Sequence, residues 1–385
     1  MIAYTISREV LSQLGEDIPE TLSSDQTTTL MTATIEMVKR ISDKDFLGMK
    51  EMDSKLARLM RFYSLMWRTA YMAKPEMVPF LACRVVQLTM ENGLSKHSIA
   101  GFLILAALLC AKSVPKKAAD IGSNIGKAAM SFLSQRHNTT ELIPEAFSYY
   151  YGFVAWRTEP LQTCTKKLGQ AFDVGMSLGE SGMAFNNSVC QIRSSILAGD
   201  RLPLLMEKVD YYMKLADAYN NELGKFFFSI FYGTIYILIG GGESSHYSAE
   251  TLPEMAIKRF LESMHFHSAL RAYWQGFYER SQHFFDKMIN VTAKSEMGQL
   301  SYTVINFFNG LNTFELMKAK VTNKLRATAM RSHEVLKNAS VHSSWNFKNK
   351  VSKIQPIDDV LSDASNNKSC FLPYIVFSSN CWRQN

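Results

Sequence analysis

Short polar or glycine-containing breaks recur along this chain at intervals of about 43 residues, a spacing typical of stacked helical pairs. Four such breaks are Asn92-Gly93, Arg136-His137-Asn138, Leu178-Gly179 and Asn220-Asn221. An amphipathic helical pattern precedes each break, and a more apolar helical pattern follows it. A helical pair of this length cannot cover its own apolar face, so neighbouring pairs must stack. The repeat therefore predicts an all-α chain, built as a right-handed superhelix of stacked antiparallel helical pairs.

The composition agrees with a helical chain. Only 20 glycines and 10 prolines occur in 385 residues, together with 21 methionines and 24 phenylalanines. A sandwich or barrel needs more turn residues, whereas methionine suits adaptable packing between helices. We expect a helical lead-in over residues 1–54, repeats over 55–242, further repeats with a basic stripe over 243–354, and an irregular or disordered tail over 355–385.

The stretch IGSNIGKAAM, residues 121–130, looks at first like a phosphate-binding loop. A phosphate loop needs four residues between its glycines, Ser or Thr after the lysine, and a strand leading in. Here three residues separate Gly122 from Gly126, and Ala128 follows Lys127. The stretch is therefore interpreted as a helix whose small residues let a neighbouring helix approach closely.

Two long apolar runs raise the question of a membrane. SIAGFLILAALLCA, from Ser98, is too short to cross a bilayer, whereas FFFSIFYGTIYILIGGG, from Phe226, approaches spanning length. Both runs follow a break at the same phase of the repeat, where the inner helix of a stacked pair would be buried on all sides. Core helices are the favoured interpretation. A membrane-embedded helical protein that uses the apolar helix at 226–242 is the alternative.

The cysteines and the amino terminus indicate a cytoplasmic protein. The amino-terminal MIAYTISREV lacks a charged leader followed by an apolar run. No cysteine belongs to a C-x-x-C pair, and the first four lie in apolar helical patterns, so we expect reduced core thiols. The six cysteines are Cys83, Cys110, Cys164, Cys190, Cys370 and Cys381.

The densest set of potential metal ligands is Glu262, His265, His267 and His283. Glu262 and His265 share a helical face, whereas His267 points elsewhere, so we predict surface or core histidines. No nucleophile elbow, Ser-His-Asp arrangement or kinase signature stands out. The sequence thus predicts no catalytic residue, no cofactor, no metal and no small-molecule substrate, and the chain is not expected to be an enzyme.

Basic residues concentrate near the carboxyl end of the helical region. Between residues 318 and 353, nine Lys and Arg face a single acid, Glu334, and this excess accounts for the formal net charge of +7. The nine are Lys318, Lys320, Lys324, Arg326, Arg331, Lys337, Lys348, Lys350 and Lys353. Such a stripe attracts acidic proteins, nucleic acid or anionic lipid.

An apolar stripe of Met317, Val321, Leu325 and Ala329 predicts that one helix carries most of these bases on its solvated face. After a plain solvated face, an acidic protein partner is the favoured interpretation, ahead of nucleic acid or a membrane. The candidate partner-binding residues are Lys318, Lys320, Lys324, Arg326 and Arg331.

Several packing motifs carry a family resemblance. They are TISREVLSQLGEDIPE from Thr5, SDKDFLGMKEMDSKLARLMRFYSLMWRTAYMAKPEMVPFLACRVVQLTMENG from Ser42, FFNGLNTFELMKAK from Phe307 and HSSWNFKNKVSKI from His342. This span resembles the tetratricopeptide-like helical segment of large composite signalling proteins. In that family an AAA-type or related signal-transduction ATPase, often behind a protein kinase domain, precedes the array. A GAF domain and a histidine kinase or nucleotide cyclase follow it.

The resemblance implies which domains adjoin this chain, but it implies no catalytic residue within it. It implies a non-catalytic scaffold or relay that contacts adjoining ATPase, kinase or GAF domains, and the family's ATP-binding residues and phosphoacceptor histidine have no counterpart here. The pattern departs at both ends, because no upstream module precedes the span and FLPYIVFSSNCWRQN, after a polar stretch, fits neither repeat nor family. We therefore expect part of a longer gene product, or a divergent tail.

Overall fold

The computed structural model describes residues 2–39, 46, 48–110, 116–135, 139–242, 254–292 and 299–354. Across these residues the chain forms sixteen α-helices and no β-strand beyond an isolated bridge between Glu51 and Leu94. The all-α prediction is confirmed. The chain divides into unit 1, up to Ala155, and unit 2, from Trp156. This division falls inside the predicted segment 55–242, and the predicted boundaries of the repeats stay predictions. The predicted tail, 355–385, lies outside the described residues.

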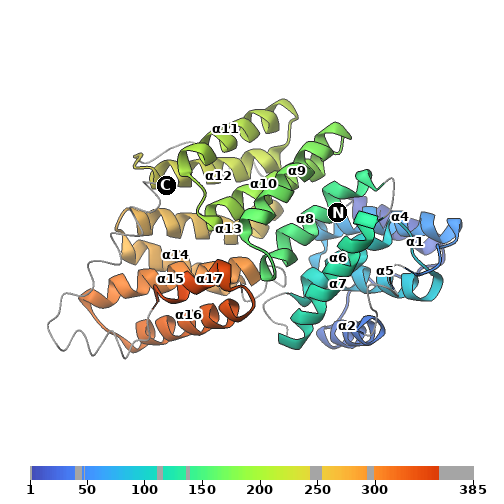
Figure 1. Cartoon of the computed structure of the whole chain (residues 1–385), viewed down its shortest axis with the longest axis horizontal. Helices are drawn as coiled ribbons and strands as arrows, with labels where there is room; N and C mark the ends of the chain where they lie inside the picture. The colour runs from blue at the N-terminus through green and yellow to red at the C-terminus, as the bar shows by residue number, and fades with distance from the viewer. Residues whose placement is uncertain are drawn as a thin grey trace. The chain divides into compact units, whose positions relative to one another are not determined.

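Unit 1 is built around one fully buried helix. Its helices are α1 (Ile2–Gln13), α2 (Ser24–Val38), α4 (Ser54–Ala73), α5 (Val78–Asn92), α6 (Ser98–Leu109), α7 (Lys116–Gln135) and α8 (Ile143–Tyr149). α1 packs on α4 and α2 on α5, while α6 contacts α5, α7 and α8 (Figure 1). Every residue of α6 is buried, so the prediction of a core helix for this apolar run is confirmed.

The glycines of IGSNIGKAAM lie within the continuous helix α7. A Cβ added to Gly122 would stand 2.8 Å from Cβ of Leu109 in α6, and one added to Gly126 would stand 3.1 Å from the Tyr150 ring. Lys127 points to solvent. The predicted role of these small residues, to let neighbouring helical segments approach closely, is confirmed.

Unit 2 consists of helical pairs followed by one short helix. The elements are α9 (Leu161–Ser177), α10 (Ser181–Ala198), α11 (Leu202–Ala218), α12 (Glu222–Leu238), α13 (Glu254–Trp274), α14 (Tyr278–Thr292), α15 (Gln299–Ala319), α16 (Asn323–His342) and α17 (Ser344–Val351). Each odd-numbered helix from α9 to α15 packs on the next, and neighbouring pairs touch. Within unit 2, Figure 1 shows α11 to α16 following one another in chain order.

Three of the four predicted breaks are turns between consecutive helices. Gly93, Gly179 and Asn220 have φ angles of 104°, 75° and 51°, a region that glycine and asparagine tolerate best. These residues separate α5 from α6, α9 from α10, and α11 from α12. The fourth break, at residues 136–138, lies outside the described part of the chain.

The second apolar run is less deeply buried than the sequence suggested. In α12 one face, including Phe226, Phe228 and Phe231, is buried, but Tyr232 and Tyr236 stack on a half-exposed face. The expectation of burial on all sides is therefore wrong for this helix, because its neighbours α10, α11 and α13 leave that face uncovered. Among the described helices, none combines the length and apolarity that crossing a bilayer requires.

The four cysteines in the described chain are buried and form no disulfide. Burial raises the pKa of Cys83 to about 11 and that of Cys164 to about 12. Such thiols stay protonated and unreactive near neutral pH. They are core residues, as predicted, whereas Cys370 and Cys381 lie outside the described residues.

Candidate partner-binding face

The basic segment forms two helices rather than one. α15 ends at Ala319 and α16 begins at Asn323. Thr322 caps α16, since its hydroxyl oxygen accepts a hydrogen bond from the backbone amide of Leu325 at 3.3 Å. The prediction of a single helix through this segment is wrong, because the threonine cap starts a new helix.

The predicted apolar stripe is divided by this turn. Met317 of α15 packs with Leu325 and Ala329 of α16 in one small cluster. Val321, which lies in the turn, is 44% exposed. The stripe therefore joins two helices of a pair instead of marking the buried face of one helix.

Two of the five candidate bases are engaged by acids of their own chain. Lys318 Nζ lies 2.7 Å from Oε2 of Glu315, one turn earlier in α15. Lys324 Nζ lies 2.7 Å from Oδ2 of Asp286 in α14. The second pair fastens the start of α16 to α14, so these two lysines are partly neutralised locally.

The other three candidates, Lys320, Arg326 and Arg331, are exposed and form no ion pair with any described residue. Lys320 lies in the turn, whereas Arg326 and Arg331 belong to α16. The structure thus brings together only part of the predicted set. Of the three, Arg326 lies on the same side of α16 as exposed apolar side chains.

The outer face of α16 combines positive charge with exposed apolar side chains. We use this name for Arg326, Met330, Lys337 and Val341, which recur at spacings of four, seven and four residues and so share one side of the helix. Met330 is 61% exposed and Val341 is 65% exposed. The opposite side of α16 is buried against its neighbours through Thr328, Ala329, Ser332 and Leu336.

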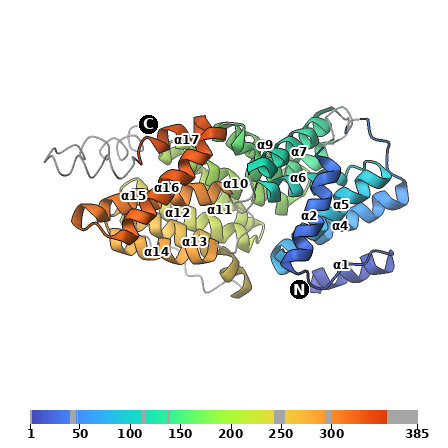
Figure 2. The ribbon, with the colours of Figure 1, turned by 90° about the horizontal axis from the view of Figure 1, so that it is seen from below.

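The surface continues into α17, which packs on α16 in both views of unit 2 (Figures 1 and 2). Trp345, four residues after Val341, is 51% exposed, and Lys348 is also exposed. Tryptophan and arginine are the residue types that most often anchor protein interfaces. This combination of cations with an exposed indole and thioether is typical of a surface that binds another chain.

Sequence reasoning selected the bases and missed the apolar members of this surface. Met330, Val341 and Trp345 look like core residues when only their hydrophobicity is counted. Helical phase was the available signal for Met330 and Val341, because they fall opposite the buried positions Ser332 and Leu336.

Lys350 is half-buried, unlike the exposed cations of this surface. Its ammonium donates a hydrogen bond to the carbonyl of Asn346 at 2.8 Å and lies 5.7 Å from the centre of the Phe347 ring. Burial, together with the nearby charge of Lys353, lowers the pKa of Lys350 to about 8. Not every cation of the basic segment therefore faces solvent.

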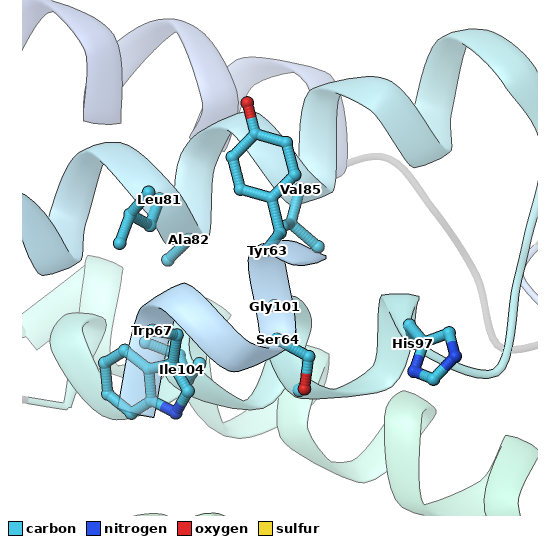
Figure 3. Close-up of a pocket in the computed structure, with 10 residues that line it drawn as sticks. Tyr63, Ser64, Trp67, Leu81, Ala82, Val85, His97, Gly101 and Ile104 are labelled. Carbon is cyan, nitrogen blue, oxygen red and sulfur yellow. The ribbon is translucent and has the colours of Figure 1, made fainter. Parts of the chain in front are cut away.

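A recess in unit 1 is another place where polar groups converge. It lies between α4, α5 and α6 and is lined by Ser64 and Trp67 of α4, by His97 just before α6, and by apolar side chains (Figure 3). Its empty volume of about 260 Å³ includes open solvent, so the enclosed space is far smaller than the roughly 300–1,000 Å³ typical of ligand pockets. The recess offers little room for a substrate.

Two polar side chains at this recess form hydrogen bonds with other side chains of unit 1. Ser64 Oγ donates to Glu145 at 3.4 Å, and the indole nitrogen of Trp67 donates to the hydroxyl of Tyr149. Burial, with the positive charge of Lys96, lowers the pKa of His97 to about 4, so this ring is neutral at pH 7. The serine is thus directed at a carboxylate that also accepts hydrogen bonds from Arg68 and Tyr149.

The candidate metal ligands point to different neighbours. His267 of α13 is 3% exposed and shares a hydrogen bond of 3.0 Å with the hydroxyl of Thr234 in α12. His265 instead stacks on the Phe284 ring of α14, 6.1 Å between centres. Within the described residues, no three His, Cys, Asp or Glu side chains are grouped to hold a metal ion.

In comparisons with known proteins, no family model, no curated protein and no solved structure matched this chain. The resemblance to composite signalling proteins therefore rests on the packing motifs alone.

Proposed function

We propose that this chain is a non-catalytic helical-repeat scaffold that binds an acidic protein partner on the outer face of α16. The observation that carries the proposal is the meeting of cations and exposed apolar groups on one helix side, Arg326 and Lys337 beside Met330 and Val341. Positive charge steers an acidic partner, while the apolar side chains supply the area that must be buried for lasting contact.

The proposal includes a finer description of the fold. The successive pairs of unit 2 form a tetratricopeptide-like stack, a right-handed superhelix in which each pair covers the apolar face of the one before. Support comes from the order of helix contacts, α9 with α10 through to α15 with α16, and from the glycine and asparagine turns between helices.

We also propose the context that the family resemblance implies. In this proposal the chain lies between an ATPase and an output kinase or cyclase domain and relays a change from one to the other. A relay of this kind requires that the partner bind two states of the parent protein with different affinity. Sequencing of long transcripts across the locus tests the context, and a reading frame separate from any such module would contradict it.

Binding of an acidic helix is the direct test of the proposed face. The probe is a labelled amphipathic peptide with glutamates on one side and leucines on the other, titrated against the full chain by fluorescence anisotropy. Reversing both charges in Arg326→Glu with Lys337→Glu should weaken binding by about 100-fold, because two attractive contacts become repulsive.

The matched control is Lys166→Glu with Lys208→Glu, which changes the net charge equally at exposed positions of α9 and α11. Equal losses in both double variants would show only a nonspecific charge effect and would overturn the proposal. Trp345→Ala should also weaken binding, by about tenfold. Tyr211→Ala, which removes a comparably exposed aromatic ring from α11, should not.

A further inference from the structure

The described chain ends at Ile354, which is fixed against the inner side of unit 2. Its carbonyl oxygen accepts a hydrogen bond from His333 Nδ1 of α16 at 2.6 Å, so that nitrogen carries the proton. The Ile354 side chain is fully buried in the unit 2 core and lies where a Cβ on Gly310 of α15 would be only 2.6 Å from it. The described chain therefore ends beside His333.

The position of His333 places this end of the described chain next to the outer face. Met330 lies one turn before His333 in α16, and Lys337 lies one turn after it. At 1.5 Å per residue, these are separations of about 4.5 Å and 6 Å along the helix axis. Arg326, seven residues before His333, shares the same side of the helix. A segment that leaves at Ile354 starts within reach of both cations.

The segment that follows, QPIDDVLSDASNN at residues 355–367, has a composition complementary to that face. It contains Asp358, Asp359 and Asp363 and no Lys or Arg. Ile357, Val360 and Leu361 add apolar side chains that match the exposed thioether and valine of α16. Asp358 is the fourth residue after Ile354, a reach of up to about 14 Å when extended. Contact with Lys337 or Arg326 therefore needs no rearrangement of unit 2.

We propose that residues 355–367 bind the outer face of α16 within the same chain and compete there with an acidic partner. The inference rests on the proposed function, since it names the occupant and the regulation of the same face. A tethered segment acts at an effective concentration of about millimolar, so a weak intrinsic contact is enough to occupy the face. The partner must displace this segment, and release of the segment raises the apparent affinity.

Zero-length crosslinking of the full chain tests the contact. A water-soluble carbodiimide activates a carboxylate, which then forms an amide bond with a lysine Nζ while the reagent takes up the lost water as a urea. Peptide mass spectrometry should find Lys337 joined to Asp358, Asp359 or Asp363 at least about tenfold more often than Lys208. Lys208 is the control because it is exposed and lies on α11 of the same unit.

A mixture of ¹⁵N-labelled and unlabelled chains tells a contact within one chain from a contact between two copies. Links within one isotope species are expected. Links that join the two species would make a second copy the occupant and overturn the proposal. Equal linking to Lys337 and Lys208 would overturn it as well.

The acidic probe peptide provides a separate readout. The triple variant Asp358→Asn, Asp359→Asn, Asp363→Asn should bind the probe about five- to tenfold more tightly than the natural chain, because the competitor is weakened. An unchanged affinity, with the probe still bound, would overturn the competition while leaving the proposed function intact. If neither chain bound the probe, the proposed function would fail, and the crosslinks alone would decide whether the segment occupies the face.

Discussion

The side-chain oxygen of Asn346 in α17 accepts a hydrogen bond from the backbone amide of Leu161, 3.0 Å away and 185 residues earlier in the chain. Leu161 opens α9, where backbone N–H groups lack partners within the helix. The Asn346 amide nitrogen donates to the carbonyls of Trp156 and Glu159 at 2.9 and 3.1 Å. The last helix thus completes the hydrogen bonding of the first residues of unit 2, and the two ends of this unit are closed on each other.

Asn346→Ala should destabilise unit 2 by about 1–3 kcal/mol, because the buried backbone amide of Leu161 loses its acceptor, while the Trp156 carbonyl keeps its bond from Ser343 Oγ. Urea unfolding followed by circular dichroism measures the change. Asn349→Ala is the matched control, since Asn349 lies on the same helix and is exposed, and it should change stability by less than about 0.5 kcal/mol. Equal effects of the two substitutions would show that the closure contributes little.

A second prediction concerns Glu16, which fastens the start of unit 1 to α4 and α5. Its carboxylate accepts hydrogen bonds from Tyr63 Oη at 2.6 Å and from Arg84 Nε at 2.8 Å. Burial raises the pKa of Glu16, but these bonds and the Arg84 charge outweigh it, so the pKa is lowered overall. A lowered folded-state pKa stabilises the fold above the unfolded pKa, and this contribution is lost as pH falls through the folded pKa.

Glu16→Gln should therefore reduce the stability of unit 1 by about 2 kcal/mol at pH 7, through loss of charged hydrogen bonds. The difference from the natural chain should shrink as the pH falls below the unfolded pKa of about 4.3, and it should vanish once the folded carboxyl is protonated as well. Glu20→Gln is the control, because Glu20 is 78% exposed and lies 3.8 Å from Arg8. Thermal unfolding at pH 7 and pH 3.5 gives both comparisons, and a pH-independent difference would contradict the assignment.

The parts of the fold that could be predicted from sequence are those encoded locally. Gly93 and Gly179 end helices because they adopt positive φ angles that are unfavourable for other residues. A glycine at such a position can be recognised directly in the sequence. Similarly, the residues of α6 are apolar around the whole helix, which predicts burial on all sides. By contrast, the break before α16 depends on one threonine cap, Thr322, inside a sequence whose pattern is helical throughout. A threonine can either cap a new helix or stay inside a continuing one, so the local sequence does not decide between the two.

The candidate site could be predicted only in part, because the rest of it depends on contacts between residues that are distant in sequence. A run of bases is a local signal, but whether a cation is free depends on its partners in space. Lys324 meets Asp286, 38 residues away in sequence, and nothing in the local sequence around either residue marks that pair. The closure by Asn346 is equally nonlocal, and an asparagine in the first turn of a short helix does not by itself indicate a contact 185 residues away.

A third prediction uses the close approach of α7 to α6. Gly122→Ala would place a Cβ at 2.8 Å from the Leu109 side chain and 2.9 Å from the Ala106 carbonyl oxygen. Because neither neighbour is the free end of a flexible side chain, the helices must separate, at a cost of about 1–3 kcal/mol. A fall in melting temperature is expected.

Gly182→Ala is the matched comparison, since nothing lies within 4 Å of a Cβ built on this glycine of α10. There the substitution should be neutral or stabilise the protein by up to about 1 kcal/mol, because alanine loses less backbone entropy on folding. If Gly122→Ala also raised the melting temperature, the contact between α6 and α7 would have to be looser than the structure shows.

The fourth prediction concerns His267, which is held without charge between α12 and α13. Its ring lies edge-on to Phe231 at 5.2 Å between centres and shares a hydrogen bond with Thr234. Burial, with the charge of Arg271 nearby, lowers the pKa of His267 to about 3. The unfolded chain binds a proton at this ring near pH 6.5, whereas the folded chain does not, so stability must fall as the pH falls below about 6.5.

Between pH 7 and pH 5 this one ring should remove about 2 kcal/mol of stability, since each pH unit below the unfolded pKa is worth about 1.4 kcal/mol. His267→Gln keeps a hydrogen-bonding group opposite Thr234 but cannot take up a proton, so it should lose about 2 kcal/mol less than the natural chain over that interval. His97, whose pKa is also lowered, is present in both proteins and cancels in the comparison. Urea unfolding at the two pH values measures the difference. Equal losses would mean that His267 reaches solvent and accepts a proton in the folded state.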